Sequence, residues 1–166
     1  STPFDLESAK FLNELMDVYK ISSSDITNKP FIRSICGFGK PIILSTGASN
    51  LWEIEEAVSW IDDYRLPLVL MHCILNYPTE NQHANLGMIL DLKRKFPDKV
   101  IGYSDHTLPG KMKPIEIAAL LGACVLEKHF TYDKTLSGND HYHAMDKDDL
   151  KLFINNIEQT FELLGS

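Results

Sequence analysis

Short runs of apolar residues recur along the chain and predict buried β-strands. Most of their positions are apolar, and β-branched and aliphatic residues dominate. A strand with one solvent-exposed face would instead alternate polar and apolar residues. The observed pattern is typical of parallel strands that are covered on both faces. The predicted strands are 18–24, 41–46, 66–73, 99–106 and 123–131.

Helical patterns lie between these runs and carry recognisable start and stop signals. Asp5, Asn28 and Asn50 stand where N-terminal caps are expected, and Pro30 comes early in its segment. Glycines close several of the patterns. The last pattern is long and amphipathic, with acidic residues in its first turn that interact favourably with the helix dipole. The predicted helices are 6–18, 29–39, 50–63, 84–96, 113–122 and 146–165.

The regular alternation of strands and helices predicts a parallel α/β fold. Polar residues end nearly every predicted strand, at 22–24, 45–46, 72, 104–106 and 127–129. A TIM barrel builds its site from the carboxyl ends of many strands, whereas an open doubly wound sheet binds its ligand at one switch point, usually beside a glycine-rich loop. No G-x-G-x-x-G or Walker sequence is present. The pattern therefore favours a TIM (β/α)8-type barrel.

The barrel is predicted to be partial. A complete eight-stranded barrel needs roughly 200–250 residues, whereas this chain has 166 residues and five full predicted strands. We interpret the opening STPF as the tail of a sixth strand. Residues 1–166 are therefore expected to form a single catalytic-barrel segment that covers about strands 4–8 and the end of strand 3, without the first strands.

Composition limits the partners and the cellular location that are expected for the protein. The net charge of −7 leaves no basic stripe for a nucleic acid. No apolar run approaches the roughly 20 residues of a membrane span, and there is no signal-peptide pattern, so a cytoplasmic location without membrane contact is expected. Cys36, Cys73 and Cys124 lie far apart and form no C-x-x-C motif. We predict that they are reduced thiols in the core.

Two histidines end consecutive predicted strands. His106 and His129 should lie side by side at the mouth of a parallel barrel, which is a suitable geometry for two ligands of a divalent metal. The alternative is that both are hydrogen-bonded histidines at the rim. His141 and His143 form a rival pair in a polar segment, for which a solvated loop is the favoured interpretation.

An ammonium group and several hydroxyls also lie at the ends of the predicted strands. Charge-assisted hydrogen bonds from such groups suit a phosphate or a carboxylate, although serines also commonly hydrogen-bond to their own turns. The candidate anion-binding residues are Lys20, Ser23, Ser45 and Ser104.

Three carboxylates are candidates for acid/base chemistry: Asp25, Glu127 and Asp140. The alternative for Asp25 is to cap the next helix, and the alternative for Glu127 is to pair with a lysine inside the barrel. The segment NYPT at 76–79 predicts a turn that holds one aromatic ring and one amide, a feature that is often merely structural.

Taken in order, the segments YKISSSD, GKPIILSTG, HCILNYPT, IGYSDHT and LEKHFTYDKTLSGNDHYHAMD resemble the sialic acid (N-acetylneuraminate) synthase family. The likeness covers almost the whole chain. It implies a TIM barrel that condenses phosphoenolpyruvate with an N-acetylhexosamine, typically N-acetylmannosamine, using Mn²⁺ or a similar divalent ion. It also implies a homodimer in the full-length protein and a C-terminal antifreeze-like domain, which is expected to be absent from residues 1–166.

The resemblance assigns roles motif by motif. His106 and His129 resemble catalytic metal ligands, and Asp105 between Ser104 and His106 would orient its neighbours rather than complete a hydrolase triad. Asp25 stands where the family usually has an acidic residue proposed for acid/base work on the enolpyruvate. The residues that resemble phosphoenolpyruvate contacts are Lys20, Ser23, Ser45 and Ser104. Those that resemble sugar contacts are Tyr77, Asp140 and Asn76, the last displaced by one position from an asparagine that many members carry.

Two alternatives stay open at this point. A metal-dependent aldolase or sugar isomerase on the same barrel would not need the phosphate-binding set. A non-catalytic fragment that binds a sugar or a partner would need neither the metal nor the acid/base groups.

Overall fold

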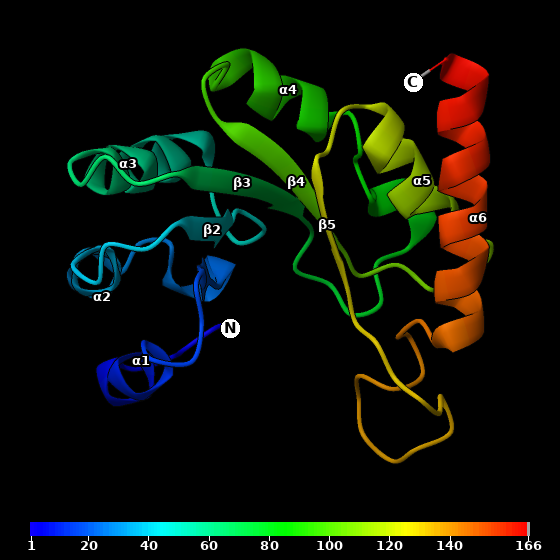
Figure 1. Ribbon diagram of the computed structural model, residues 1–166, viewed down its shortest axis with the longest axis horizontal. Helices are drawn as coiled ribbons and strands as arrows, with labels where there is room; N and C mark the ends of the chain where they lie inside the picture. Colours follow the sequence, from blue (N-terminus) through cyan, green and yellow to red (C-terminus); the bar gives the residue numbers. More distant parts are fainter. Residues whose placement is uncertain (166) are drawn as a thin grey trace.

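A computed structural model describes residues 1–165 and shows one curved parallel sheet with helices around its outer side (Figure 1). The strands pair in chain order, and each lies inside its predicted range, so the five strand predictions are confirmed. The strands are β1 (Tyr19–Ile21), β2 (Ile42–Ser45), β3 (Leu68–Cys73), β4 (Val100–Asp105) and β5 (Val125–Lys128).

All six predicted helices are also present. The prediction for the first was too long, because the chain already turns where Leu15 N–H donates to the Leu12 carbonyl at 2.9 Å. The helices are α1 (Leu6–Leu12), α2 (Lys29–Cys36), α3 (Leu51–Asp62), α4 (Met88–Lys95), α5 (Lys113–Leu120) and α6 (Lys147–Leu164). Two short 3-10 helices are η1 (Ser23–Asp25) and η2 (Asn81–His83).

Capping side chains set the starts of several helices. Asp5 Oδ1 accepts a hydrogen bond from Ser8 N at 2.8 Å at the start of α1, and Asn28 Oδ1 accepts one from Phe31 N at 3.3 Å at the start of α2. Asp146 Oδ1 accepts from two backbone N–H groups of the first turn of α6, at 2.9 and 3.0 Å. These bonds satisfy donors that have no partner within the helix, which explains why the chain turns helical at the predicted places.

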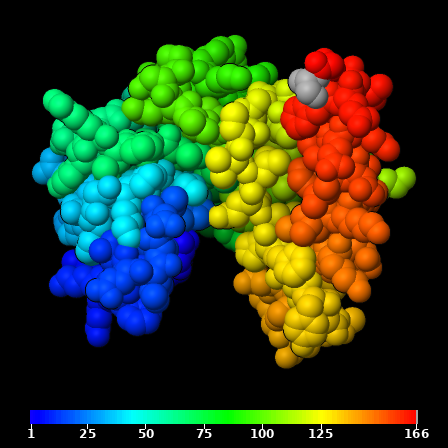
Figure 2. All heavy atoms as spheres, in the orientation of Figure 1, coloured from blue at the N-terminus to red at the C-terminus, as the bar shows by residue number. Residues whose placement is uncertain are grey.

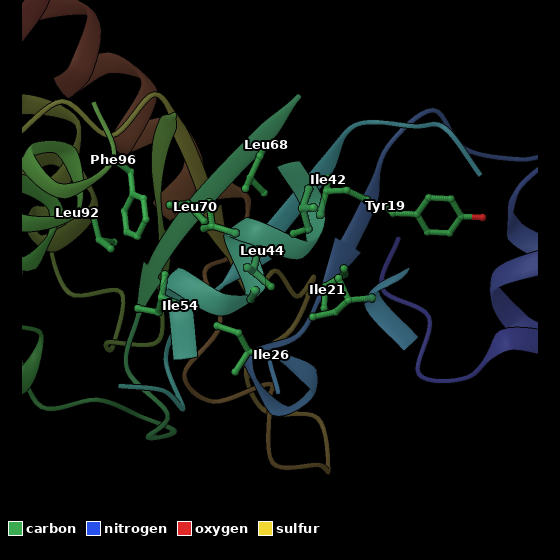
Figure 3. Packing of buried hydrophobic residues seen from close by; sticks show 14 of the residues in the cluster. Tyr19, Ile21, Ile26, Ile42, Leu44, Ile54, Leu68, Leu70, Leu92 and Phe96 are labelled. Atoms are coloured by element: carbon green, nitrogen blue, oxygen red, sulfur yellow. The ribbon is translucent and has the colours of Figure 1, made fainter. Parts of the chain in front are cut away.

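Alternation along the strands divides the sheet into two faces. Tyr19, Ile21, Ile42, Leu44 and Leu70 are completely buried and pack under the helices, as Figure 3 shows. The intervening residues point to the concave face. Gly102 lies on that face, where an added Cβ would come within 2.2 Å of Met71 Sδ and 2.6 Å of the Val125 carbonyl oxygen. A glycine therefore lets β3, β4 and β5 pack closely where the sheet curves.

The sheet forms a half-barrel with two open edges, β1 and β5. Figure 2 shows the molecule hollowed between the N-terminal part, in blue, and the yellow and orange segment that follows β5. The predicted tail of a sixth strand is not a strand in residues 1–4, but Lys20 N–H donates to the Ser1 carbonyl at 2.9 Å. The start of the chain therefore lies alongside β1 through this bond.

The three cysteines are free thiols. Cys36 and Cys73 are buried, as predicted, and burial raises the pKa of Cys36 to about 11. Cys124 is exposed, so the prediction that it belongs to the core is wrong. It directly precedes β5, the strand at one open edge of the sheet, where it has less covering structure around it.

Within residues 1–165, no helix combines the length and the apolar character needed to cross a lipid bilayer.

Candidate active site

A cavity of about 420 Å³ opens at the carboxyl ends of the strands, between β1 and β5. Seven of the ten site residues predicted from the sequence line it, drawn from the ends of β1, β2, β4 and β5 and from the turn after β3. They are Lys20, Ser23, Ser45, Tyr77, Ser104, His106 and His129.

His106 is held in a defined tautomer just beyond β4. Its Nδ1 lies 2.7 Å from the Ile74 carbonyl oxygen. Because a carbonyl oxygen only accepts, Nδ1 must carry the proton, which leaves the lone pair on Nε2. Burial is the main reason why the pKa of His106 is lowered, and the neighbouring His129 lowers it further. The imidazole is therefore biased toward the neutral form that can coordinate a cation.

His129 follows β5 and faces His106. The two rings are 5.5 Å apart, centroid to centroid, at an interplanar angle of 63°. Parallel pairing of Asp105 with Lys128, one residue before each histidine, brings them together. Burial again lowers the pKa of His129, partly opposed by the charge of Asp140. Two neutral imidazoles thus share one end of the cavity.

Tyr77 packs against both rings. Its ring centroid is 4.1 Å from that of His106 and 5.8 Å from that of His129. The turn that carries it is fixed to the end of β4, because Thr79 N–H donates to the His106 carbonyl at 2.8 Å and Thr79 Oγ1 donates to the Asn76 carbonyl at 2.7 Å. The tyrosine therefore has a defined position beside the histidines.

A carboxylate lies between the anion-binding candidates. Glu127 Oε1 accepts a hydrogen bond from Ser104 Oγ at 2.7 Å and lies 3.3 Å from Lys20 Nζ. The interpretation that Glu127 pairs with a lysine inside the barrel is therefore confirmed. Ser45 Oγ, on the neighbouring β2, is buried and has no hydrogen-bond partner among residues 1–165. A buried polar atom without a partner indicates a place where a ligand or water binds.

Three predicted site residues do not line the cavity. Asp25 ends η1, where its Oδ1 accepts from Asn28 Nδ2 at 3.4 Å, and Asn76 is exposed in the turn. Asp140 is exposed in the loop after β5. Its Oδ1 lies 3.5 Å from Nε2 of His143. Their assignments as acid/base and sugar-binding residues stay predictions.

His143 contradicts the interpretation of residues 141–143 as a solvated loop. Its side chain is 1% exposed, and neither ring nitrogen has a hydrogen-bond partner within the described chain. Its ring centroid is 5.1 Å from that of His129 and 6.1 Å from that of Tyr77. Met145 N–H donates to the His129 carbonyl at 2.9 Å, which returns the loop to the end of β5. The residues of this loop show no local pattern that would predict its return to the end of β5.

The structure offers a limited set of metal ligands. No group of three or more His, Cys, Asp or Glu within residues 1–165 is arranged to hold a metal ion. His106 and His129 are two neutral imidazoles at a separation that suits two ligands on one cation, and Nε2 of His106 is free of strong hydrogen bonds. The donor set therefore fits an ion with two protein ligands and an otherwise open coordination sphere.

The fold and the cavity define a parallel (β/α) half-barrel with its candidate site at the carboxyl ends of the strands. The NeuB family model matches residues 1–166. The chain belongs to the NeuB family.

Relatives and solved structures agree with this membership. The chain is 45% identical to the N,N'-diacetyllegionaminic acid synthase of Campylobacter jejuni, over 99% of this chain and 50% of that protein. It is 40% identical to the Legionella pneumophila protein of the same name, over 100% of this chain and 48% of that protein. It superposes with a TM-score of 0.92 and 35% identity on the N-acetylneuraminic acid synthetase of Leptospira borgpetersenii, covering 99% of this chain and 57% of that one.

The chain spans about half the length of the curated relatives it matches. A further structural neighbour, a truncated 3-deoxy-D-arabino-heptulosonate 7-phosphate synthase from Thermotoga maritima, has a TM-score of 0.82 at 16% identity. At that identity the likeness concerns the fold alone, and it supports the half-barrel description.

Proposed function

We propose that the protein to which this chain belongs condenses phosphoenolpyruvate with an N-acetylated amino sugar to give a nonulosonic acid and inorganic phosphate. The observation that carries the proposal is the combination, in one cavity of a NeuB-family half-barrel, of two facing neutral imidazoles with a lysine and serines. The two imidazoles suit a divalent ion, and the lysine and serines suit a highly anionic substrate.

The anionic substrate is assigned to the side of the cavity formed by β1, β2 and β4. Lys20 supplies the positive charge, and Ser23, Ser45 and Ser104 supply hydroxyl donors around it. The Ser45 hydroxyl has no internal partner in the described residues, so an incoming phosphate or carboxylate oxygen would satisfy it without displacing another bond. Glu127 holds Lys20 in the cavity before the substrate arrives.

The sugar is assigned to the opposite side, near Tyr77, His106 and His129. A divalent ion, with Mn²⁺ as our expectation, would be held by the two histidines and would stabilise negative charge on the sugar carbonyl oxygen during carbon–carbon bond formation. Tyr77 provides an apolar face against which the sugar packs, and its position beside both rings orients the aldehyde toward them.

The overall reaction is balanced by one water molecule. Carbon 3 of phosphoenolpyruvate attacks the open-chain aldehyde, water adds to carbon 2, and phosphate leaves with cleavage of the bond between carbon 2 and the bridging oxygen. Proton transfer requires a carboxylate within reach. Glu127 lines the cavity and is the better placed of the three candidates, whereas Asp25 and Asp140 would need to approach it.

The acceptor is an N-acetylated amino sugar. The relatives at 45% and 40% identity are both named N,N'-diacetyllegionaminic acid synthases, so a hexose with two acetamido groups is the first acceptor to test beside N-acetylmannosamine. At Asn76 the chain departs from the family pattern, because the asparagine expected to recognise a single N-acetyl group is displaced by one position.

The test is release of phosphate from phosphoenolpyruvate by the full-length protein with Mn²⁺ and a panel of N-acetylated hexoses. We expect phosphate release that depends on one of the acceptors, together with a product carrying three more carbons. Cleavage or isomerisation of a sugar without phosphoenolpyruvate would instead indicate the aldolase or isomerase alternative. Sugar binding without any turnover would indicate a non-catalytic role.

A further inference from the structure

A buried ion pair lies directly behind the two candidate metal ligands. Asp105 Oδ2 and Lys128 Nζ are 2.7 Å apart, and the two side chains are 2% and 1% exposed. The residues are register partners at the ends of β4 and β5. Strand alternation places their side chains on the opposite face of the sheet from those of Ser104 and Glu127. The cavity is lined by Ser104 and Glu127 and is also bordered by Lys128, whose side chain is 1% exposed.

Every polar atom of this pair has a partner. Asp105 Oδ1 accepts hydrogen bonds from Tyr103 OH at 3.0 Å and from Thr107 N–H at 2.9 Å. Lys128 Nζ donates to the Thr107 carbonyl at 2.7 Å in addition to the carboxylate. The network therefore fixes the backbone on both sides of His106. It also fixes the side chain of Lys128, which directly precedes His129 in the sequence.

Stability alone is a weak reason for such a pair. Removing two charges from water is costly, and apolar residues of similar volume often replace a buried ion pair without loss of stability. What apolar residues do not reproduce is directional bonding that fixes the end of one strand relative to the next. The best-attested use of buried polar contacts is to set register and geometry in this way.

We propose that Asp105 and Lys128 are positioning residues that set the distance and orientation between His106 and His129. The inference rests on the proposed role of these histidines as metal ligands. Partners behind a ligand that fix its orientation typically affect metal affinity by 10- to 100-fold. Here the effect would act mainly through the backbone at positions 105, 107 and 128, since the hydrogen bonds of the pair go to one another, to Tyr103 and to Thr107.

The test uses the full-length protein and removes both charges together, so that neither is left buried alone. For Asp105→Leu/Lys128→Met we expect Mn²⁺ affinity, measured by calorimetry, to fall at least tenfold. The denaturant midpoint should also fall, because Tyr103 OH and Thr107 N–H lose their buried partner, but a single cooperative unfolding transition should remain. The matched control is Asp62→Asn/Lys99→Met, which removes another ion pair, with atoms 2.7 Å apart, next to the opposite end of β4. It should leave the affinity unchanged.

The outcomes separate this inference from the proposed function. A parent protein that binds no Mn²⁺ would overturn the metal site and the positioning role with it. In a second outcome the parent binds Mn²⁺, His106→Ala loses this binding, and Asp105→Leu/Lys128→Met binds Mn²⁺ as tightly as the parent. That result would overturn the positioning role alone. If that double variant does not fold, Asp105→Asn/Lys128→Gln retains polar groups without charge. Because glutamine is shorter than lysine, it cannot keep the 2.7 Å bonds to residue 105 and to the Thr107 carbonyl, so this variant should fold with weakened Mn²⁺ binding. Failure of both doubles to fold would assign the pair to stability and reject the inference.

Discussion

Lys20 Nζ lies 3.3 Å from Oε1 of Glu127, although the two residues belong to β1 and β5, the opposite edges of the sheet. A flat sheet of five strands at a spacing of roughly 4.8 Å would hold these side chains much farther apart. The contact therefore shows how strongly the sheet curves. It also places a cation and a carboxylate at the centre of the half-barrel mouth, where the proposed chemistry takes place.

Replacing Lys20 should weaken the use of phosphoenolpyruvate. Loss of a charge-assisted bond to a phosphate costs roughly 1.5–3 kcal/mol, so Lys20→Ala is expected to raise the KM for phosphoenolpyruvate about ten- to a hundredfold and the KM for the sugar much less. Steady-state kinetics of the full-length protein measure both. Lys10→Ala, on the surface of α1, is the control. Unchanged dependence on phosphoenolpyruvate would remove Lys20 from the site.

Removing either imidazole should abolish turnover without unfolding the protein. His106→Ala and His129→Ala each delete one of two expected metal ligands near the rim of the cavity, so Mn²⁺ binding should fall sharply while the unfolding transition is largely kept. Calorimetry with Mn²⁺ and denaturant titration test the two parts. His83→Ala, in exposed η2, is the control. Parental affinity in both variants would direct attention to His141 and His143 instead.

His143 should be replaceable by an apolar ring with a gain in stability. Neither buried ring nitrogen has a hydrogen bond in the described residues, and the nearest carboxylate to Nε2 is the exposed Asp140, 3.5 Å away. An unsatisfied buried polar group costs about 1–3 kcal/mol. We expect His143→Phe to raise the free energy of unfolding by about 1 kcal/mol, as measured in denaturant. His141→Phe is the contrast, because His141 Nδ1 lies 2.8 Å from Thr131 Oγ1 and this hydrogen bond would be lost. A destabilised His143→Phe variant would show that its nitrogens find partners in solution.

Acid should destabilise the fold through its buried histidines. Burial lowers the pKa of His72 below its usual 6.5, against a smaller opposing effect of the bond to the Ala84 carbonyl. Below pH 6.5 the unfolded chain therefore binds a proton that the folded protein resists, so the free energy of unfolding should fall from pH 7 toward pH 5. One such group contributes at most about 1.4 kcal/mol per pH unit.

The variant His72→Phe isolates this contribution. The slope of unfolding free energy against pH should become shallower in His72→Phe and stay as in the parent for His83→Gln, whose side chain is 60% exposed. Denaturant melts at a series of pH values measure it. The slope does not vanish, because His106 and His129 have pKa values shifted in the same direction for the same reason. An identical slope in His72→Phe would contradict the assignment.

A sample of residues 1–166 should self-associate. β1 and β5 are open edges, and large apolar side chains such as Phe4, Phe11 and Phe130 are more than half exposed. Unpaired edges and apolar patches favour association. Light scattering should detect dimers or larger species. A stable monomer that unfolds in one cooperative transition would mean that the edges are satisfied within the half-barrel.

Local patterns were enough to predict the order of strands and helices and the polar character of the strand ends. Side-chain capping by Asp5, Asn28 and Asp146 acts within one turn of helix, and the apolar runs of the strands reflect burial on both faces. These signals act over a few residues, so they can be recognised without knowledge of the fold. The same holds for the candidates at strand ends, because parallel strands bring their carboxyl ends to one edge.

Contacts between distant segments were decided by the tertiary structure. The sequence by itself determined that His106 and His129 end neighbouring strands, but the bond from Nδ1 of His106 to Ile74, which selects its tautomer, depends on where the turn after β3 folds back. The burial of His143 depends on the return of its loop to β5. Asp25, Asn76 and Asp140, which the family resemblance assigns to the site, do not line the cavity. The position of such residues beyond the strand ends is set by long-range hydrogen bonds and packing, which the local residue pattern does not encode.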